Sequence, residues 1–276
     1  MTKQDAVTLN WHGDTAVVTL NRPEKRNALN MPMFKQLSQI AQQLSKYSRC
    51  RAVIIHGAGQ DFCAGLDVNA ITTHPTSIVR LLFKWLPGQT NLAQQVSRCW
   101  RKLPMPVICV IHGNCLGGGL QIALGADFRI ATPDSRFAVM ETQWGLLPDM
   151  GGLLGLRENT RRDQLLKLSL TSEIFPADTA LELGVITALS DNPMQQALDW
   201  CEQFAQHPFP AIKATKRSYV RSWTGSERTL LARETAYQIG LLIKKDRGSA
   251  SVTPEQRTTD VGEIKQRRPE GKDQSH

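Results

Sequence analysis

The sequence predicts an α/β protein with a helical C-terminal region. Short apolar strands alternate with helices over the first two thirds of the chain, and helical patterns dominate from about residue 158. Two glycine-rich loops each follow a buried strand. With 276 residues, of which 41% are hydrophobic and 21% charged, the chain has the size and composition of one large globular domain or of a core with a smaller appendage.

The first predicted elements are a β-hairpin and a helix. Residues 6–21 alternate apolar and polar positions on both sides of a turn at His12-Gly13-Asp14. Pro32 then stands near the first turn of a helix, where its missing N–H group leaves no hydrogen bond unmade. The apolar stripe of this helix consists of Phe34, Leu37, Ile40, Ala41 and Leu44.

Two short apolar runs, at residues 52–56 and 107–111, are predicted to be buried strands. A helical pattern at 92–103 separates them, and residues 71–90 fit neither pattern clearly. Further strands are expected at 128–131, at 137–140 and briefly near 185–187. In the C-terminal third, three prolines stand near predicted helix starts: Pro176, Pro193 and Pro210.

Charge and cysteine content narrow the function classes. The chain carries 33 lysines and arginines against 25 acidic residues, a net charge of +8, which suggests an anionic partner. Its six cysteines include no CxxC pair and none at zinc-finger spacing with histidine, so we expect free thiols and no metal site.

No apolar run approaches the ~18 residues that a membrane span needs, and the chain starts with polar residues, so we expect a cytoplasmic protein.

The two glycine-rich loops carry the first sign of chemistry. One contains Asp61-Phe62-Cys63-Ala64-Gly65-Leu66-Asp67, and the other contains His112-Gly113-Asn114-Cys115-Leu116-Gly117-Gly118-Gly119-Leu120-Gln121. Neither fits the Walker, dinucleotide-binding or nucleophile-elbow motifs. Two loops with free backbone N–H groups suggest an oxyanion hole, whereas close backbone packing explains a glycine triple equally well.

A second candidate lies in the stretch Met140–Gly152. It holds two carboxylates, Glu141 and Asp149, among apolar neighbours that include Trp144 and Met150. Apolar surroundings raise a carboxyl pKa, as a general acid or base requires. The alternative is that both residues only cap local turns.

Four motifs in order, NRPEKRNAL, DFCAGLD, HGNCLGGGLQIALGADFRIA and METQWGLLPDMGG, resemble the crotonase superfamily of enoyl-CoA hydratases and isomerases. The resemblance runs from about residue 5 to 245. It implies a β/α spiral core over residues 1–195 and a helical C-terminal domain over 196–276 that makes homotrimers or hexamers, with a polar tail. It also implies an acyl-CoA substrate, a CoA thioester that needs no further cofactor.

The same resemblance assigns roles to individual residues. The backbone N–H groups of Leu66 and Gly118 would hold the thioester oxygen, and Glu141 would move a proton, with Asp149 and Gln121 as further catalytic candidates. The positions matching the substrate- and CoA-binding residues are Glu24, Lys25, Arg26, Ala28, Ala64, Gly65, Asp67, Val68, Gly117 and Leu146. Lys25 and Arg26 have the charge that CoA phosphates require.

One departure from the family pattern bears on the reaction. Hydratases of the family use two glutamates, but the first position holds Gln121, which cannot accept a proton at neutral pH. Enoyl- or dienoyl-CoA isomerisation through Glu141, with Asp149 as a second proton carrier, is therefore favoured. The alternatives are a hydratase variant in which Gln121 holds the water, and a non-catalytic acyl-CoA- or RNA-binding protein. RNA binding is disfavoured because the basic residues lack interleaved aromatic ones.

Overall fold

The structure of the chain is a computed structural model that describes residues 5–73, 75–86 and 88–246. Its main sheet has six strands in the order β1-β2-β3-β4-β6-β9. β1 and β2 form an antiparallel hairpin, and every later pairing in this sheet is parallel. The strands are β1 (Val7–His12), β2 (Thr15–Leu20), β3 (Ala52–Gly57), β4 (Val107–Ile111), β6 (Phe128–Ala131) and β9 (Ala188–Leu189).

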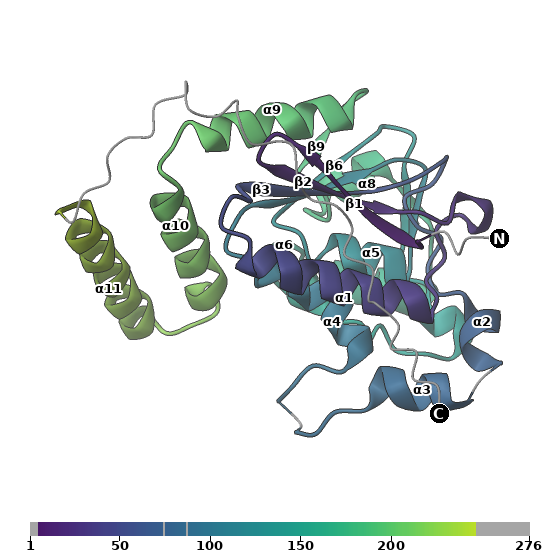
Figure 1. Cartoon of the computed structure of the whole chain (residues 1–276). Coiled ribbons are helices and arrows are strands. Elements are labelled where there is room, and N and C mark those ends of the chain that lie inside the picture. The colour runs from purple at the N-terminus through teal and green to yellow at the C-terminus, as the bar shows by residue number, and fades with distance from the viewer. Residues whose placement is uncertain (1–4, 74, 87, 247–276) are drawn as a thin grey trace, which may run out of the picture.

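Both faces of the main sheet are covered. On one face, alternate residues of β3 and β4 such as Val53 and Cys109 join the principal core with α1 (Met31–Lys46) and α4 (Leu92–Arg101). On the other face, Ile54 and Ile108 pack with Cys201 of α9 (Pro193–Ala205). Figure 1 shows α1 and α9 on opposite sides of the sheet. Burial on both faces explains why these strands are continuous apolar runs in the sequence.

A smaller sheet carries the second glycine loop. It consists of β5 (Asn114–Leu116), β7 (Arg136–Ala138) and β8 (Phe175–Pro176), with β7 in the middle. The short helix α5 (Gly118–Ala123) starts two residues after β5, and all of its residues are buried. The other short elements are η1 (Pro23–Lys25), α2 (Val68–Thr72), α3 (Pro75–Leu82), η2 (Glu141–Trp144), α6 (Leu153–Asn159), α7 (Arg162–Thr171) and α8 (Ala177–Glu182).

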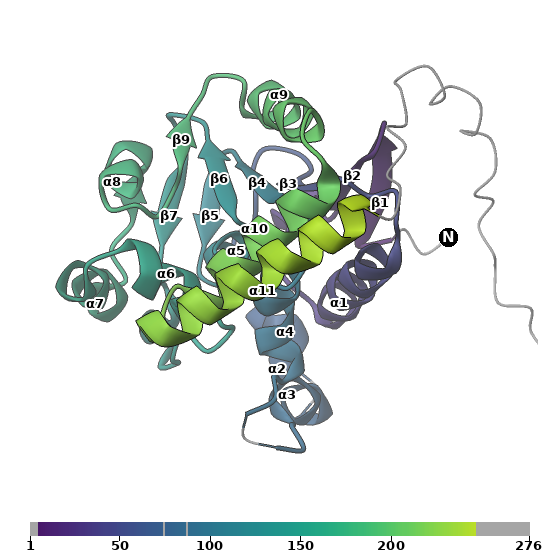
Figure 2. The same ribbon diagram turned by 90° about the vertical axis from the view of Figure 1, so that its left-hand side faces the viewer.

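The C-terminal region ends in two helices, α10 (Phe209–Ser222) and α11 (Glu227–Asp246), which pack against each other at the side of the core (Figure 2). α11 leaves large apolar side chains half exposed, among them Leu231, Ile239 and Leu242. Such a face is typical of a surface that contacts another chain. The predicted domain boundary at residue 195 falls within α9 and stays a prediction, and the predicted polar tail lies largely outside the described residues.

The structure confirms most of the elements that the sequence predicts. The helix predicted around Pro32 starts at Met31, with the Asn30 side chain accepting a hydrogen bond from the Met33 amide. The strand expected near 185–187 is displaced and begins at Ala188. The reason is that the amides of Val185 and Ile186 both donate to the carbonyl of Ala180, closing the turn after α8. Within the described residues, no helix is long and apolar enough to cross a membrane.

Candidate functional site

The two glycine loops lie side by side. Cys63 and Cys115 form a parallel bridge in which the Cys63 amide donates to the Asn114 carbonyl and the Leu116 amide donates to the Cys63 carbonyl, both over 2.9 Å. In this register Leu66 and Gly118 each follow a bridge residue by three positions. A Cβ atom placed on Gly65 would lie 3.8 Å from the Gly118 nitrogen, so the two segments meet where the sequence predicts an oxyanion hole.

The backbone N–H groups of Leu66 and Gly118 are available for a ligand. Neither donates a hydrogen bond to an acceptor within the described part of the chain. Gly118 is the first residue of α5, where no helical acceptor exists for its N–H. Leu66 is only partly buried. Two such amides beside each other can bind a carbonyl oxygen and the oxyanion that develops from it.

Glycine is required in these loops for two different reasons. Gly65 has φ +100° and Gly117 has φ +48°, and both angles are unfavourable for other residues. Gly119 serves packing instead, because a Cβ atom there would lie 2.6 Å from the Cβ of Cys63. The close-packing interpretation of the glycine triple is therefore confirmed at Gly119, and the oxyanion hole at Gly118 stays a prediction.

The carboxylate of Glu141 lies next to these amides. A Cβ atom placed on Gly117 would lie 3.6 Å from Oε1 of Glu141. Oε1 accepts a 2.5 Å hydrogen bond from Nε2 of Gln121, whereas Oε2 is buried and has no partner among the described residues. The structure thus brings Glu141 and Gln121 together beside the predicted oxyanion hole.

The environment of both predicted carboxylates favours their protonated forms. Burial raises the pKa of Glu141, and the charge of Asp149 raises it further, while the hydrogen bond from Gln121 acts in the opposite direction. Burial also raises the pKa of Asp149. A carboxyl group with a raised pKa can both take and return a proton near neutral pH, which is the property that a proton shuttle needs.

The predicted CoA-binding positions on the first turn form an exposed rim next to the first glycine loop. Glu24 and Lys25 belong to η1, and the side chains of both residues and of Arg26 are exposed. The turn is joined to the loop by backbone hydrogen bonds from Ala64 to Arg26 and from Leu29 to Gly65.

The other predicted contact residues surround the same region. Ala28, Ala64 and Val68 are partly buried, and Leu146 is 50% exposed just beyond η2. The Leu146 amide donates to the backbone carbonyl of Glu141 over 2.9 Å, which places Leu146 next to the residue that carries the carboxylate.

Asp67 has structural partners that the sequence did not indicate. Its carboxylate accepts hydrogen bonds of 3.2 Å from both terminal nitrogens of Arg22 and of 3.1 Å from the amide of Ala70 in α2. Arg22 also donates to the carbonyl of Ala28 over 2.5 Å. Arg22 and Asp67 carry opposite charges in two of the sequence motifs, but their spacing alone does not pair them.

Asn27 is a second residue whose role appears only in the structure. It is fully buried with φ +55°, a conformation that asparagine tolerates better than most residues. Its side chain accepts from the Arg22 amide and donates to the carbonyls of Ala58 and Asp61. Asn27 therefore fixes the turn against the first glycine loop.

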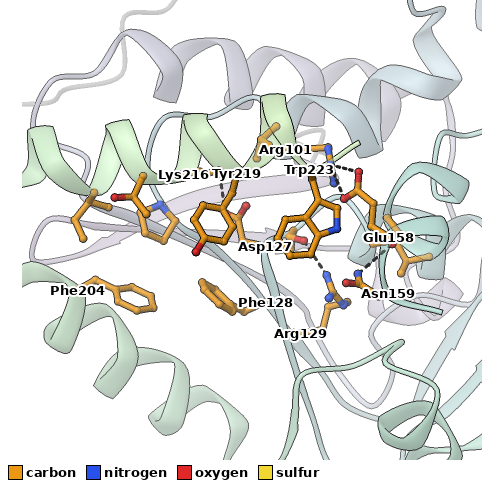
Figure 3. A pocket seen from close by; sticks show the side chains of 17 residues that line it. Arg101, Asp127, Phe128, Arg129, Glu158, Asn159, Phe204, Lys216, Tyr219 and Trp223 are labelled. Atoms are coloured by element: carbon orange, nitrogen blue, oxygen red, sulfur yellow. Dashed lines mark hydrogen bonds and ion pairs between the residues drawn. The ribbon is translucent and has the colours of Figure 1, made fainter. Parts of the chain in front are cut away.

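A large cavity lies away from the glycine loops. A cavity of about 480 Å³ separates the core from α10, and Figure 3 shows aromatic side chains including Tyr219 and Trp223 around it. Its charged groups are satisfied within the protein: Lys216 donates to Asp127 over 2.5 Å, and Arg101 donates to Glu158 over 2.6 Å. Glu141 does not line this cavity, so we place the candidate site at the glycine loops. Through its hydrogen bond with Lys216, the Asp127 side chain joins α10 to the core.

The remaining thiols and carboxylates offer no metal site within the described residues. All six cysteines are free and buried. Cys63, in the first glycine loop, donates its thiol to the Asn27 carbonyl, and burial raises its pKa to about 12. It has a packing role rather than a chemical one.

The fold and site define a class: an α/β protein that places two loop amides beside a buried carboxylate. The family model for enoyl-CoA hydratase/isomerase matches residues 15–244, so the chain belongs to this family.

The chain is 31% identical to the 1,2-epoxyphenylacetyl-CoA isomerase of Escherichia coli (strain K12) over 232 residues, which cover 80% of this chain and 84% of that protein. It is 37% identical over 175 residues to the mitochondrial Delta(3,5)-Delta(2,4)-dienoyl-CoA isomerase of Rattus norvegicus, covering 62% of this chain. The match spans little more than half, 54%, of the rat protein.

Solved structures agree with this assignment. A CoA complex of an enoyl-CoA hydratase-type protein from Thermobifida fusca YX matches with a TM-score of 0.76 and 25% identity, covering 88% of this chain and 95% of that one. The predicted crotonase fold is thereby confirmed.

Proposed function

We propose that this protein is an acyl-CoA isomerase that moves a double bond of an enoyl- or dienoyl-CoA by proton transfer through Glu141. The observation that carries the proposal is the pairing of Glu141 with Gln121 beside two free loop amides. Hydration by two carboxylates needs a second acid or base where Gln121 stands. Isomerisation needs one carboxyl group that both removes and returns a proton, and the isomerases among the relatives support this choice.

The other residues of the site have roles that follow from their positions. The N–H groups of Leu66 and Gly118 would bind the thioester oxygen and stabilise the enolate, and losing one such donor typically costs ~3–4 kcal/mol of barrier. The exposed side chains of Lys25 and Arg26 would contact the CoA phosphates. Asp149, whose pKa is raised by burial, would serve as a second proton carrier. The proposed reaction uses no cofactor, and the CoA thioester is its substrate.

The proposal extends to assembly and location. The half-exposed apolar residues of α11, such as Leu231 and Leu242, support a homotrimer or a hexamer built from two trimers. The cellular location that we propose is the cytoplasm.

The test is a direct assay of the purified protein with 2-enoyl-, 3-enoyl- and 3,5-dienoyl-CoA. We expect turnover of the 3-enoyl or 3,5-dienoyl substrate, reduced ~10²–10⁴-fold in Glu141→Gln. Unchanged turnover in this variant would exclude Glu141 as the proton carrier. Asp149→Asn is the companion variant, and a smaller loss is expected there.

A hydratase remains the second candidate, because the Thermobifida fusca structure is of the enoyl-CoA hydratase type. In that case 2-enoyl-CoA would give 3-hydroxyacyl-CoA, and Gln121→Ala would reduce the rate while Asp149→Asn would not. Product identification by mass spectrometry distinguishes the two reactions, since hydration adds the mass of water and isomerisation adds none.

A further inference from the structure

The orientation of the Gln121 side chain is fixed by the protein backbone. Its Oε1 accepts hydrogen bonds from the amides of Met150 (2.9 Å) and Gly152 (3.3 Å). Both partners are donors, so the oxygen of the side-chain amide must face them and Nε2 must face Glu141. The side chain is only 3% exposed, and a rotated amide would set Nε2 against two N–H donors and Oε1 against the carboxylate oxygen of Glu141.

This orientation makes the two oxygens of Glu141 unequal. Oε1 is held by Nε2 of Gln121 over 2.5 Å. Oε2 is buried and has no hydrogen-bond partner among the described residues, an arrangement that is unfavourable unless a ligand or a proton completes it.

We propose that Gln121 is a positioning residue that holds Oε1 of Glu141 and thereby makes Oε2 the oxygen through which Glu141 carries its proton. The proposal rests on the isomerase function proposed above. It also answers why glutamine stands at this position: the amide joins Glu141 to the backbone at Met150 and Gly152, and it does not hold a reacting water.

For a 3-enoyl thioester, the protons of the isomerisation balance with Oε2 of Glu141 as the carrier. Oε2 takes the proton from C2 of a 3-enoyl thioester, and the electron pair passes to the thioester oxygen, which the N–H groups of Leu66 and Gly118 stabilise. The dienolate then collapses, and the same proton returns from Oε2 to C4, which leaves the double bond between C2 and C3. No water is consumed. Gln121 cannot assist water addition as a base, because its Oε1 already accepts two N–H groups.

Two variants of Gln121 test the proposal. Gln121→Glu keeps the length of the side chain and an acceptor for both amides, but places a second carboxylate against Oε1. Gln121→Met keeps the approximate shape and removes the donor. In both variants we expect the pKa of Glu141 to rise by about one unit or more, because a carboxylate loses a donor or gains a like charge. Asp149 is the titratable neighbour whose charge already acts on Glu141, and it is unchanged in both variants.

Two measurements read out this shift. The first is ¹³C NMR of the protein labelled at the glutamate carboxyl groups, with the Glu141 resonance assigned as the one lost in Glu141→Gln. The second is the pH profile of kcat/KM, whose acid limb should move to higher pH in step with the NMR value. Gln203→Glu, an exposed glutamine on α9, is the matched control and should move neither.

The outcomes separate the inference from the proposed function. If the Glu141 pKa stays unchanged in folded Gln121→Glu and Gln121→Met, Gln121 only fills space and the inference is wrong. If the wild-type protein turns over none of the acyl-CoAs, the proposed function fails, and the NMR titration still decides whether Gln121 controls Glu141. A loss of activity with an unmoved acid limb also overturns the inference, because it is what a purely structural residue would give.

Discussion

Arg22 pairs with Asp67 over 3.2 Å across 45 residues of sequence. The two side chains are mostly buried, with 15% and 18% exposed. This ion pair connects the turn before α1, which contains Arg22, to the loop that carries Leu66. Asp67 also accepts from the Ala70 amide, so the same carboxylate contacts the start of α2. The carboxylate of Asp67 thus has partners within the protein, and its predicted contact with CoA stays a prediction.

Breaking this pair should destabilise the loop more than it changes chemistry. We expect Asp67→Asn or Arg22→Met to lower the free energy of unfolding by about 1–3 kcal/mol, because each leaves a partly buried partner uncompensated. In a double-mutant cycle the two losses should not add, since either variant already removes the interaction. Chemical denaturation measures both effects. Additive losses would contradict the pairing.

Replacing Glu141 by glutamine should stabilise the protein near neutral pH. Burial raises the Glu141 pKa in the folded protein, so ionisation favours the unfolded chain. This destabilisation is absent below the ordinary glutamate pKa of about 4.3. It grows as pH rises toward the folded-state value and is then constant. Glutamine cannot ionise, and its side-chain oxygen can still accept from Gln121.

The check is a series of thermal melts between pH 4 and pH 8. We expect Glu141→Gln to have a higher Tm than wild type at pH 7, with a difference that shrinks toward pH 4. Glu202→Gln on the exposed side of α9 is the control and should show no such trend. A Tm difference that is constant over this range would mean that the charge of Glu141 is not responsible.

Local patterns in the sequence sufficed for most elements of the fold. Pro32 and the apolar spacing from Phe34 to Leu44 predict α1 because a helix needs only its own first turn and one buried face. The apolar run 107–111 predicts β4 for the same local reason. The apolar run 185–187 predicts a strand too early, because the amides of Val185 and Ile186 still close the turn after α8, in which Gly184 has φ +73°.

The candidate site was only partly accessible from the sequence. The glycine loops and Glu141 were found from motifs, and the family resemblance supplied their roles. The sequence does not predict the pairing of Gln121 with backbone amides 29 and 31 residues away. That pairing depends on how the 141–152 loop folds back over α5. The same holds for Lys216 and Asp127, 89 residues apart, whose contact joins α10 to the core. Spacing carries no information on contacts of this kind.

The cysteines should be unreactive in the folded protein. Burial raises the thiol pKa of Cys50, Cys63 and Cys99 to about 12 and that of Cys201 to about 11. At pH 8 the reactive thiolate is therefore a minute fraction of each. We expect iodoacetamide to label none of the six in native protein and all six after denaturation, as counted by mass spectrometry. Rapid labelling of Cys63 in the native state, with loss of activity, would contradict its packing role.

Displacing the Leu66 amide should reduce catalysis without unfolding the protein. Gly65 has φ +100°, and a Cβ atom there would lie 3.2 Å from the Leu116 carbonyl oxygen, so Gly65→Ala must shift the backbone that presents this N–H. We expect kcat/KM on the preferred acyl-CoA to fall about 10²-fold or more, the usual effect of losing one oxyanion donor. Gly13→Ala is the control, because Gly13 has φ +56° and a Cβ atom there meets nothing within 4 Å. It adds left-handed backbone strain at the β1–β2 turn and should leave kcat/KM unchanged. Equal activity of the two variants, at comparable Tm, would show that the Leu66 amide does not hold the reacting oxygen.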